Sequence, residues 1–155
     1  MKKHILAVFV SSSVLVLTAC GGGDGDSTSV IVDDGVPKNN IVNPVVRVEA
    51  YTDVDINANV VLDSVSSSKT LMTYLMRGVN GSETQATALV FKPKGPMPAG
   101  GWPIVAWAHG TTGVADQCAP SQQGLGGNEF LIAKLLVAGY AVVAPDYEGL
   151  GEPGG

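Results

Sequence analysis

The hydrophobic positions of the chain gather in a few short runs, and the most abrupt run covers Ile104–Ala108. It follows a proline and stops at a glycine-containing stretch, His109–Gly113 (HGTTG). A short apolar run bounded in this way is typical of a strand buried on both faces of a parallel sheet. Gly110 and Gly113 can take positive φ, which glycine adopts at low cost. The HGTTG loop is therefore predicted at the carboxyl edge of the sheet, where α/β folds bind their ligands.

A helix and a second buried strand are predicted further along the chain. The run Phe130–Ala138 is apolar almost all round, and Asn128 and Glu129 before it suit an N-cap and the positive end of a helix dipole. Gly139 supplies a stop for that helix, and Tyr140–Ala144 is predicted as the strand. Strand, helix and strand in this order form a βαβ unit whose two strands lie parallel. The stretch between the HGTTG loop and this helix shows no regular pattern.

A β-hairpin is predicted before this unit. Two β-prone runs, Leu71–Val79 and Glu83–Phe91, flank the dipeptide Asn80-Gly81, which is the strongest short-range signal for a hairpin. The prolines and glycines of Lys92–Pro103 can continue neither a strand nor a helix. We therefore expect this stretch to be a surface connection that leads to the strand at Ile104.

Upstream of the hairpin the pattern is weak. The stretch Val45–Asn59 alternates irregularly and is expected to hold one short strand. The stretch Asp63–Lys69 is rich in serine and is expected to be a loop or the start of a helix. Neither stretch carries a chemical signal.

The N-terminus has the features of a bacterial export signal. Lys2 and Lys3 precede an apolar core, Ile5–Leu17, which is too short to span a bilayer as a permanent helix. The residues Leu17–Cys20 (LTAC) resemble a lipobox, in which cleavage precedes the cysteine and acyl chains are attached to its thiol. We therefore expect residues 1–19 to be a lipoprotein signal peptide. The alternative is an ordinary secretory signal that has a cysteine at this point by chance.

Lipidation would place the protein in the bacterial cell envelope. Cys20 is the expected lipidation site, and the polar, glycine-rich stretch after it makes residues 20–45 a flexible tether or linker. In the lipobox pattern an aspartate after the cysteine is linked to inner-membrane retention. Gly21 stands there instead, so we expect anchoring in the outer membrane, with secretion as the alternative. Residues 46–155 are then the folded domain.

Charge and cysteine content exclude several classes of function. The formal net charge of −5 gives no basic field for nucleic acid, and the two cysteines are too few for a disulfide scaffold. If Cys20 is lipidated, Cys118 has no partner within the sequence. We therefore expect either a disulfide partner beyond residue 155 or a buried free thiol. The sequence stops inside a glycine-rich loop, so we also expect it to be the front part of a longer protein.

Four segments together resemble a known family. They are PIVAWAHGTTG (103–113), CAPS (118–121), LLVAGY (135–140) and AVVAPDYEGLG (141–151). Their combination resembles the first half of an α/β-hydrolase, and it is similar to the secretory lipases of bacteria and fungi over about Leu71–Gly155. The resemblance implies the N-terminal portion of an α/β-hydrolase fold, with a leading β-hairpin and a βαβ unit in a mostly parallel sheet.

The resemblance also implies roles for the loop residues. In this fold, backbone N–H groups hold the negative oxygen that forms when a serine attacks an ester carbonyl. Thr111 is the expected oxyanion donor and Thr112 the second choice, while Gly110 lets the backbone turn close to the substrate. The residues expected to support the loop or line the pocket are His109, Gly113, Asp146 and Tyr147.

The catalytic triad is not expected within this sequence. No serine lies in a G-x-S-x-G motif. His109 is the only histidine after the leader, and the catalytic histidine of the family comes last in chain order, after the serine and the acid. No second histidine or cysteine lies at metal-ligand spacing from His109, so we expect no metal. The nucleophile, acid and base are therefore expected beyond residue 155.

One competing motif would indicate a nucleotide cofactor. The stretch Gly124–Gly127 opens the predicted helix, and Asp146 follows about twenty residues later, as in a dinucleotide-binding fingerprint. Glu129, however, stands in the place of the third glycine, and its charge would repel a pyrophosphate. The glycines also do not follow the strand directly. We therefore expect no cofactor.

These features predict a lipid-anchored serine hydrolase of carboxylic esters, an esterase or lipase, in which this chain supplies the oxyanion loop. The expected partners are a small-molecule ester or acyl lipid and the membrane, through Cys20, but not nucleic acid. The 155 residues alone are expected to be inactive. The alternatives are a non-catalytic or defunct surface lipoprotein with a hydrolase-like fold and a peptidase of the same fold, because fold alone does not set the substrate.

Overall fold

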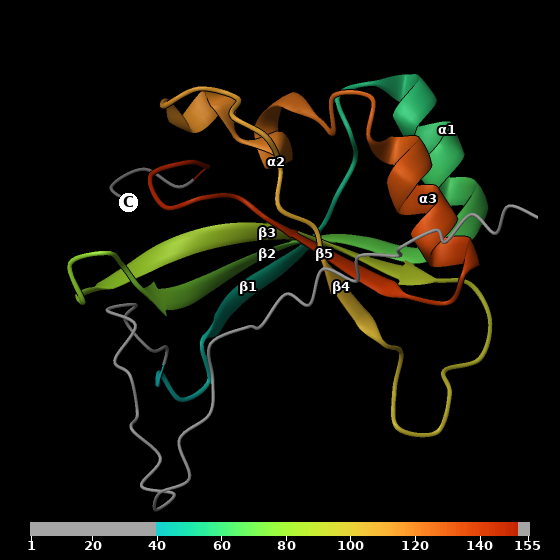
Figure 1. Cartoon of the computed structure of the whole chain (residues 1–155), viewed down its shortest axis with the longest axis horizontal. Coiled ribbons are helices and arrows are strands. Elements are labelled where there is room, and N and C mark those ends of the chain that lie inside the picture. The colour runs from blue at the N-terminus through green and yellow to red at the C-terminus, as the bar shows by residue number, and fades with distance from the viewer. Residues whose placement is uncertain (1–39, 152–155) are drawn as a thin grey trace, which may run out of the picture. The chain divides into compact units, whose positions relative to one another are not determined.

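The structure, a computed structural model, describes residues 40–151, so the predicted signal peptide, the lipidation at Cys20 and most of the tether lie outside the described residues. The elements in chain order are β1 (Val45–Ala50), α1 (Ile56–Val65), β2 (Ser66–Arg77), β3 (Glu83–Pro93), β4 (Ile104–Ala106), the 3-10 helix η1 (Asp116–Cys118), α2 (Pro120–Gln123), α3 (Glu129–Val137) and β5 (Ala141–Pro145). The strands form one sheet in the order β1-β2-β3-β5-β4 (Figure 1). Within the described stretch no helix is long and apolar enough to cross a membrane.

The predicted β-hairpin is confirmed. The strands β2 and β3 pair antiparallel, with Leu71 opposite Leu89, and the turn between them has Gly81 at a φ of 78°. The Gly81 N–H donates to the Gly78 carbonyl at 2.8 Å, which closes the turn. The first strand begins earlier than predicted, at Ser66, because it follows directly on a helix that the sequence pattern did not reveal.

That helix, α1, is where the sequence prediction fails. The single short strand expected within Val45–Asn59 is present as β1, but the loop or helix start expected over Asp63–Lys69 is wrong, because α1 ends and β2 begins there. The helix starts after Asp55, whose carboxylate accepts a first-turn N–H at 2.8 Å. Its buried residues are Ala58 and Leu62, which is too narrow an apolar face to give a clear helical period.

The elements β4, α3 and β5 form the predicted βαβ unit. The two strands pair in parallel, with Ile104 opposite Ala141, and Gly139 follows α3 at a φ of 88°. Asn128 occupies the N-cap position of α3, but its side chain makes no cap hydrogen bond. Its amide instead donates to the Leu125 carbonyl at 2.8 Å. The predicted N-cap position of Asn128 is confirmed, but its side chain closes the preceding turn and does not cap the helix.

The strand before the HGTTG loop is shorter and more exposed than predicted. It ends at Ala106 rather than Ala108, and Ile104 is 70% exposed, so burial on both faces is wrong for this strand. By contrast, Val142 in β5 is fully buried. The reason is that β4 is the edge strand of the described sheet and pairs with β5 alone, whereas β5 lies between β3 and β4.

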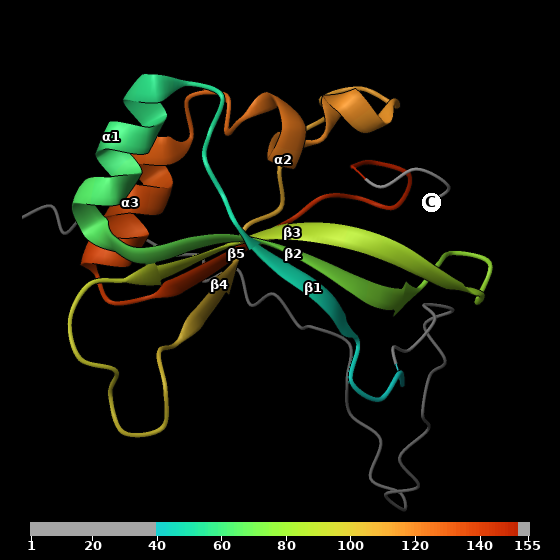
Figure 2. The same cartoon turned by 180° about the vertical axis from the view of Figure 1, so that it is seen from behind.

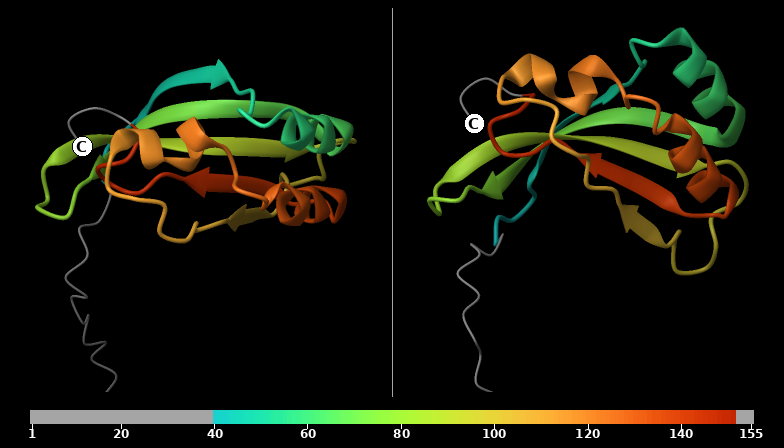
Figure 3. Two further views of the ribbon diagram at one scale, coloured as in Figure 1. Left: turned by 90° about the horizontal axis from the view of Figure 1, so that it is seen from above. Right: turned by 45° about the horizontal axis from the view of Figure 1, so that its top comes forward.

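Helices cover one face of this sheet. All three α-helices lie on the same side of it in every view (Figure 1, Figure 2 and Figure 3). The helices η1 and α2 lie in the stretch for which the sequence showed no regular pattern. The core between the covered face and the pair α1 and α3 is built from apolar side chains that include Leu62, Leu89, Phe91, Ile132, Leu136 and Val142.

Candidate functional site

A cleft of about 240 Å³ lies between the loop after β4 and the segment that leads from α2 to α3. One wall consists of the first residues of the HGTTG loop together with Trp107. The other wall is the segment 123–128 with Pro120. The lining residues are Trp107, His109, Gly110, Thr111, Thr112, Pro120, Gln123, Gly124, Leu125, Gly126 and Asn128. None of these is a serine or a cysteine, so the described wall offers no such nucleophile.

The HGTTG loop presents backbone amides that have no partner. Thr111 and Thr112 are exposed, and both line the cleft. Over residues 40–151, neither of their N–H groups donates a hydrogen bond to another protein atom. Backbone amides are obligatory donors, so amides left open at a cleft are available to an oxygen of a ligand.

The two glycines of this loop differ in conformation. Gly113 has the predicted positive φ, at 139°, and an ideal Cβ there would lie 2.4 Å from the Cys118 Sγ. Gly110 does not have a positive φ, and an ideal Cβ there would meet no atom within 4 Å. Of the two glycines that could take positive φ, Gly113 does so and Gly110 does not. The open space beside Gly110 borders the cleft.

His109 is buried, and its ring is held by a hydrogen bond to the loop backbone. Only 6% of the residue is exposed, and its Nδ1 lies 2.6 Å from the Gly110 carbonyl oxygen. A carbonyl only accepts, so Nδ1 is the donor in this bond. The ring Nε2 is buried and has no hydrogen-bond partner among the described residues. His109 therefore activates no hydroxyl or thiol here, as a general base would have to do.

Tyr147 holds the same loop from the end of β5. Its ring stacks on the His109 ring with the centroids 4.0 Å apart, and its hydroxyl donates to the His109 carbonyl. The C=O and N–H of a trans peptide point in opposite directions, and the described chain has no cis peptide. The Gly110 N–H is therefore fixed pointing away from the Tyr147 hydroxyl. In the same way, the Thr111 N–H is fixed pointing away from the His109 ring.

Asp146 lies just after β5 and is 2% exposed. Its carboxylate accepts the Thr87 hydroxyl at 2.5 Å and the Ser121 N–H at 3.2 Å, while its own N–H donates to the Thr87 carbonyl at 2.8 Å. These bonds join β3, α2 and the end of β5. Neither Asp146 nor Tyr147 is among the residues that line the cleft.

Cys118 is a free thiol, half-buried in η1. Its Sγ packs against the backbone of Gly113 in the HGTTG loop. The disulfide expected for it stays a prediction, because the described residues hold no second cysteine. Within the same residues, no group of three or more histidine, cysteine, aspartate or glutamate side chains could hold a metal ion.

The dinucleotide-like stretch 124–127 packs against the carboxylate of Asp53. Gly124 has a φ of 86°, and an ideal Cβ there would lie 2.4 Å from an Asp53 carboxylate oxygen. The Leu125 N–H donates to the other oxygen of that carboxylate at 3.3 Å. A phosphate here would meet the buried Asp53 carboxylate, and the Leu125 N–H that it would need already donates to that carboxylate. This geometry agrees with the expectation that the stretch binds no dinucleotide.

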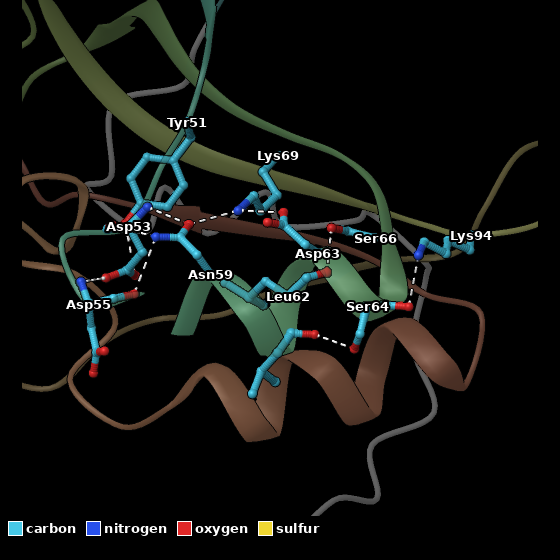
Figure 4. A network of polar contacts seen from close by, with 11 residues as sticks. Tyr51, Asp53, Asp55, Asn59, Leu62, Asp63, Ser64, Ser66, Lys69 and Lys94 are labelled. Carbon is cyan, nitrogen blue, oxygen red and sulfur yellow. Dashed lines mark hydrogen bonds and ion pairs between the residues drawn. The ribbon is translucent and has the colours of Figure 1, made fainter. Parts of the chain in front are cut away.

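Asp53 and its neighbours are the group at the cleft that sequence reasoning missed. Asp53 is 4% exposed, and its carboxylate accepts the Tyr51 hydroxyl at 3.0 Å (Figure 4). Burial, and after it the charge of Asp53, raises the pKa of Tyr51, so the phenol stays protonated and donates. The one local signal is the pair Asp53 and Asp55 before a helix, which indicates capping but does not reveal a contact to Leu125.

Comparisons with protein-family models and with curated protein sequences give no match. Among solved structures, Candida antarctica lipase A in its closed state is similar, with a TM-score of 0.55 and 20% identity over 68% of this chain and 26% of that chain. A ligand-bound form of the rice cell wall degrading esterase LipA from Xanthomonas oryzae gives a TM-score of 0.51 and 26% identity over 70% of this chain and 30% of that chain.

The chain thus spans between a quarter and a third of the length of these solved structures. In this chain the sheet is mixed, and the HGTTG loop follows a strand that pairs in parallel with β5. The described chain has part of an α/β-hydrolase fold, and its solved fold relatives are lipases and esterases.

Proposed function

We propose that this chain is the oxyanion-binding part of a lipid-anchored serine hydrolase that cleaves carboxylic esters. Small esters or acyl lipids are its substrates, the anchor is the thioether-linked lipid at Cys20, and the location is the bacterial outer membrane. The serine, acid and histidine of the triad are supplied by residues beyond 155. The fold relatives, a lipase and an esterase, support the reaction class.

The observation that carries the proposal is the state of the loop amides. The amides of Thr111 and Thr112 have no partner over residues 40–151, and both residues line the cleft. When a serine hydroxyl attacks an ester carbonyl, the carbonyl oxygen gains negative charge, and fixed N–H donors lower the barrier by about 3 kcal/mol each. The loop contributes such donors without a metal or cofactor.

The side chains around the loop fix its donors before the substrate arrives. The His109 ring holds the Gly110 carbonyl, and the Tyr147 hydroxyl holds the His109 carbonyl. The peptide that carries the Thr111 N–H and the peptide before it are therefore fixed. A donor that needs no reorganisation stabilises a transition state best. In this mechanism His109 orients the loop and transfers no proton.

The first experiment asks whether the protein is a serine hydrolase at all. The protein is expressed from its complete reading frame and treated with a fluorophosphonate probe, which reacts with an activated serine. We expect covalent labelling that is lost after heat denaturation and is competed by a small ester. Absence of labelling in the folded protein would contradict the proposal and favour the non-catalytic surface lipoprotein.

The second experiment asks whether the Thr111 amide is the donor. Thr111→Pro deletes the N–H and is expected to lower kcat/KM for a p-nitrophenyl ester by about 10²-fold to 10³-fold. Thr111→Ala keeps the N–H and is expected to retain most of the activity. Thermal unfolding of both variants controls for loss of fold. Equal activity of the two variants would show that the amide has no such role.

A further inference from the structure

A carboxylate from the N-terminal side of the domain reaches the wall of the cleft that lies opposite the HGTTG loop. Asp53 lies between β1 and α1 and is buried. One carboxylate oxygen accepts the Tyr51 hydroxyl at 3.0 Å and the Leu125 N–H at 3.3 Å. The other accepts the Asp55 N–H at 2.9 Å. The bond to Leu125 joins residues 72 positions apart in the chain.

The wall that Asp53 contacts has little freedom to move toward it. Gly124, Leu125 and Gly126 all line the cleft. At Gly124 an ideal Cβ would lie 2.4 Å from an Asp53 oxygen, so the carboxylate is packed directly against the wall backbone. The side chain of Leu125 is 3% exposed and belongs to the core cluster with Tyr51. The wall is therefore fixed by its side chain from the core and by its amide from Asp53.

Asp53 itself is held rigidly by polar contacts to α1 and β2. Its N–H donates to the Asn59 side-chain oxygen at 2.9 Å, and the Asn59 amide donates to its carbonyl at 2.6 Å. Figure 4 shows Asn59 between Asp53 and Lys69, whose ammonium donates to the same Asn59 oxygen at 2.7 Å. Lys69 also pairs with Asp63 at 2.7 Å. A carboxylate fixed in this way can define the position of whatever it holds.

We infer that Asp53 is a positioning residue for the cleft: by holding the Leu125 amide, it sets the distance between the 124–126 wall and the oxyanion loop. The significance of that distance for substrate binding rests on the proposed function. Asp53 does not line the cleft, so it acts through the wall and not on the substrate. Loss of Asp53 loosens the wall, weakens substrate binding and leaves the loop donors in place.

The test compares Asp53→Ala with Asp55→Ala in the protein expressed from its complete reading frame. Both variants remove a carboxylate that accepts a backbone N–H at the start of α1, but Asp53 alone contacts Leu125. Hydrogen exchange is measured at the Leu125 amide and at core amides of β5. We expect Asp53→Ala to speed exchange at Leu125 by about tenfold or more relative to the core, and Asp55→Ala to leave this ratio unchanged. An unchanged ratio in both variants would overturn the inference.

A second pair keeps the test decisive if Asp53→Ala does not fold. Gly124→Ala and Gly126→Ala both place a side chain on a residue with positive φ, but only the methyl at position 124 meets Asp53. Gly124→Ala is expected to speed exchange at Leu125 more than Gly126→Ala does. Equal effects of the two substitutions would contradict a role for the Asp53 contact.

Kinetics separate this inference from the proposed function. With p-nitrophenyl esters, Asp53→Ala is expected to raise KM several-fold while kcat stays within about twofold. The reason is that a looser wall weakens binding of the substrate and of the transition state equally. A fall in kcat with KM unchanged would overturn the positioning role. If the wild-type protein hydrolyses no ester, the proposed function fails, and the exchange ratio at Leu125 still decides whether Asp53 fixes the wall.

Discussion

Two glycine-containing loops leave neighbouring parallel strands at the same edge of the sheet, and they are built in opposite ways. The loop after β5 begins with buried Asp146 and ends with buried Leu150 and Gly151. The amide and the carboxylate of Asp146 are used in bonds to β3 and α2, and the Leu150 amide donates to the Tyr147 carbonyl within the loop. The loop after β4 is exposed at Thr111 and Thr112, and the amides of both are open over residues 40–151.

The difference shows where a ligand can bind at this edge. In the loop after β4 the carbonyls of His109 and Gly110 are satisfied, while the amides of Thr111 and Thr112 are not. Free amides that follow two satisfied carbonyls favour a negatively charged oxygen. The loop after β5 supports this arrangement by supplying Tyr147. One loop is thus scaffold, and the other is available for binding.

The largest effect is expected from a substitution in the loop after β5, which we call the scaffold loop. Asp146→Ala leaves the Thr87 hydroxyl and the Ser121 N–H without their acceptor in a buried place. We expect the free energy of unfolding to fall by about 3 kcal/mol, because hydrogen bonds to charged groups are the strong ones and the lost bonds are buried or half-buried. Urea denaturation measures it. Thr111→Ala in the other loop is the comparison and is expected to change stability by less than about 0.5 kcal/mol. Similar losses at both positions would show that the two loops do not differ as argued.

The next prediction compares the two glycines of the HGTTG loop. Gly113→Ala places a methyl group at positive φ and against the Cys118 Sγ, and we expect it to cost about 2 kcal/mol. Gly110→Ala meets no atom within 4 Å and no backbone strain, so we expect a change within about 0.5 kcal/mol. Thermal and urea unfolding of both variants check this. A loss at position 110 as large as that at 113 would contradict the observed conformations.

Local signals predicted the parts of the fold that local chemistry determines. The turn at Asn80-Gly81 and the stop at Gly139 each depend on a few adjacent residues, and both are confirmed. The order of strand, helix and strand is also confirmed, because each apolar run is recognised from its own composition. The edge position of β4 was not visible, since it depends on which strands pair, and the exposed Ile104 is chemically like any buried isoleucine.

The missed part of the site depends on contacts between distant residues. Nothing near Asp53 indicates that its carboxylate meets Leu125, and nothing near Asp146 indicates that it meets Thr87, 59 positions away. The helix α1 was missed for a related reason: its packing on α3 and β2 fixes it, while its own apolar face is narrow. The roles predicted for Thr111 and Thr112 stay predictions, and the structure adds that their amides have no partner over residues 40–151.

The smallest effect tests the link between the two loops. Tyr147→Phe keeps the ring that stacks on His109 and removes only the hydroxyl that donates to the His109 carbonyl. We expect stability to fall by about 1 kcal/mol, the usual net value of one hydrogen bond. The freed His109–Gly110 peptide adjoins the peptide that carries the Thr111 N–H, so that donor is oriented less firmly. We therefore expect kcat for ester hydrolysis to fall by about tenfold, a fraction of what loss of a whole donor costs, with KM little changed.

Tyr74→Phe is the matched control for this last substitution. Tyr74 is a half-buried tyrosine of β2 that is not among the residues lining the cleft, and burial raises the pKa of its phenol. Its replacement is expected to leave kcat unchanged. If Tyr147→Phe raises KM and preserves kcat, the hydroxyl shapes binding and does not orient the donors. If both variants behave alike, the scaffold loop does not control the binding loop, because the hydroxyl is the one group of Tyr147 that fixes a peptide plane.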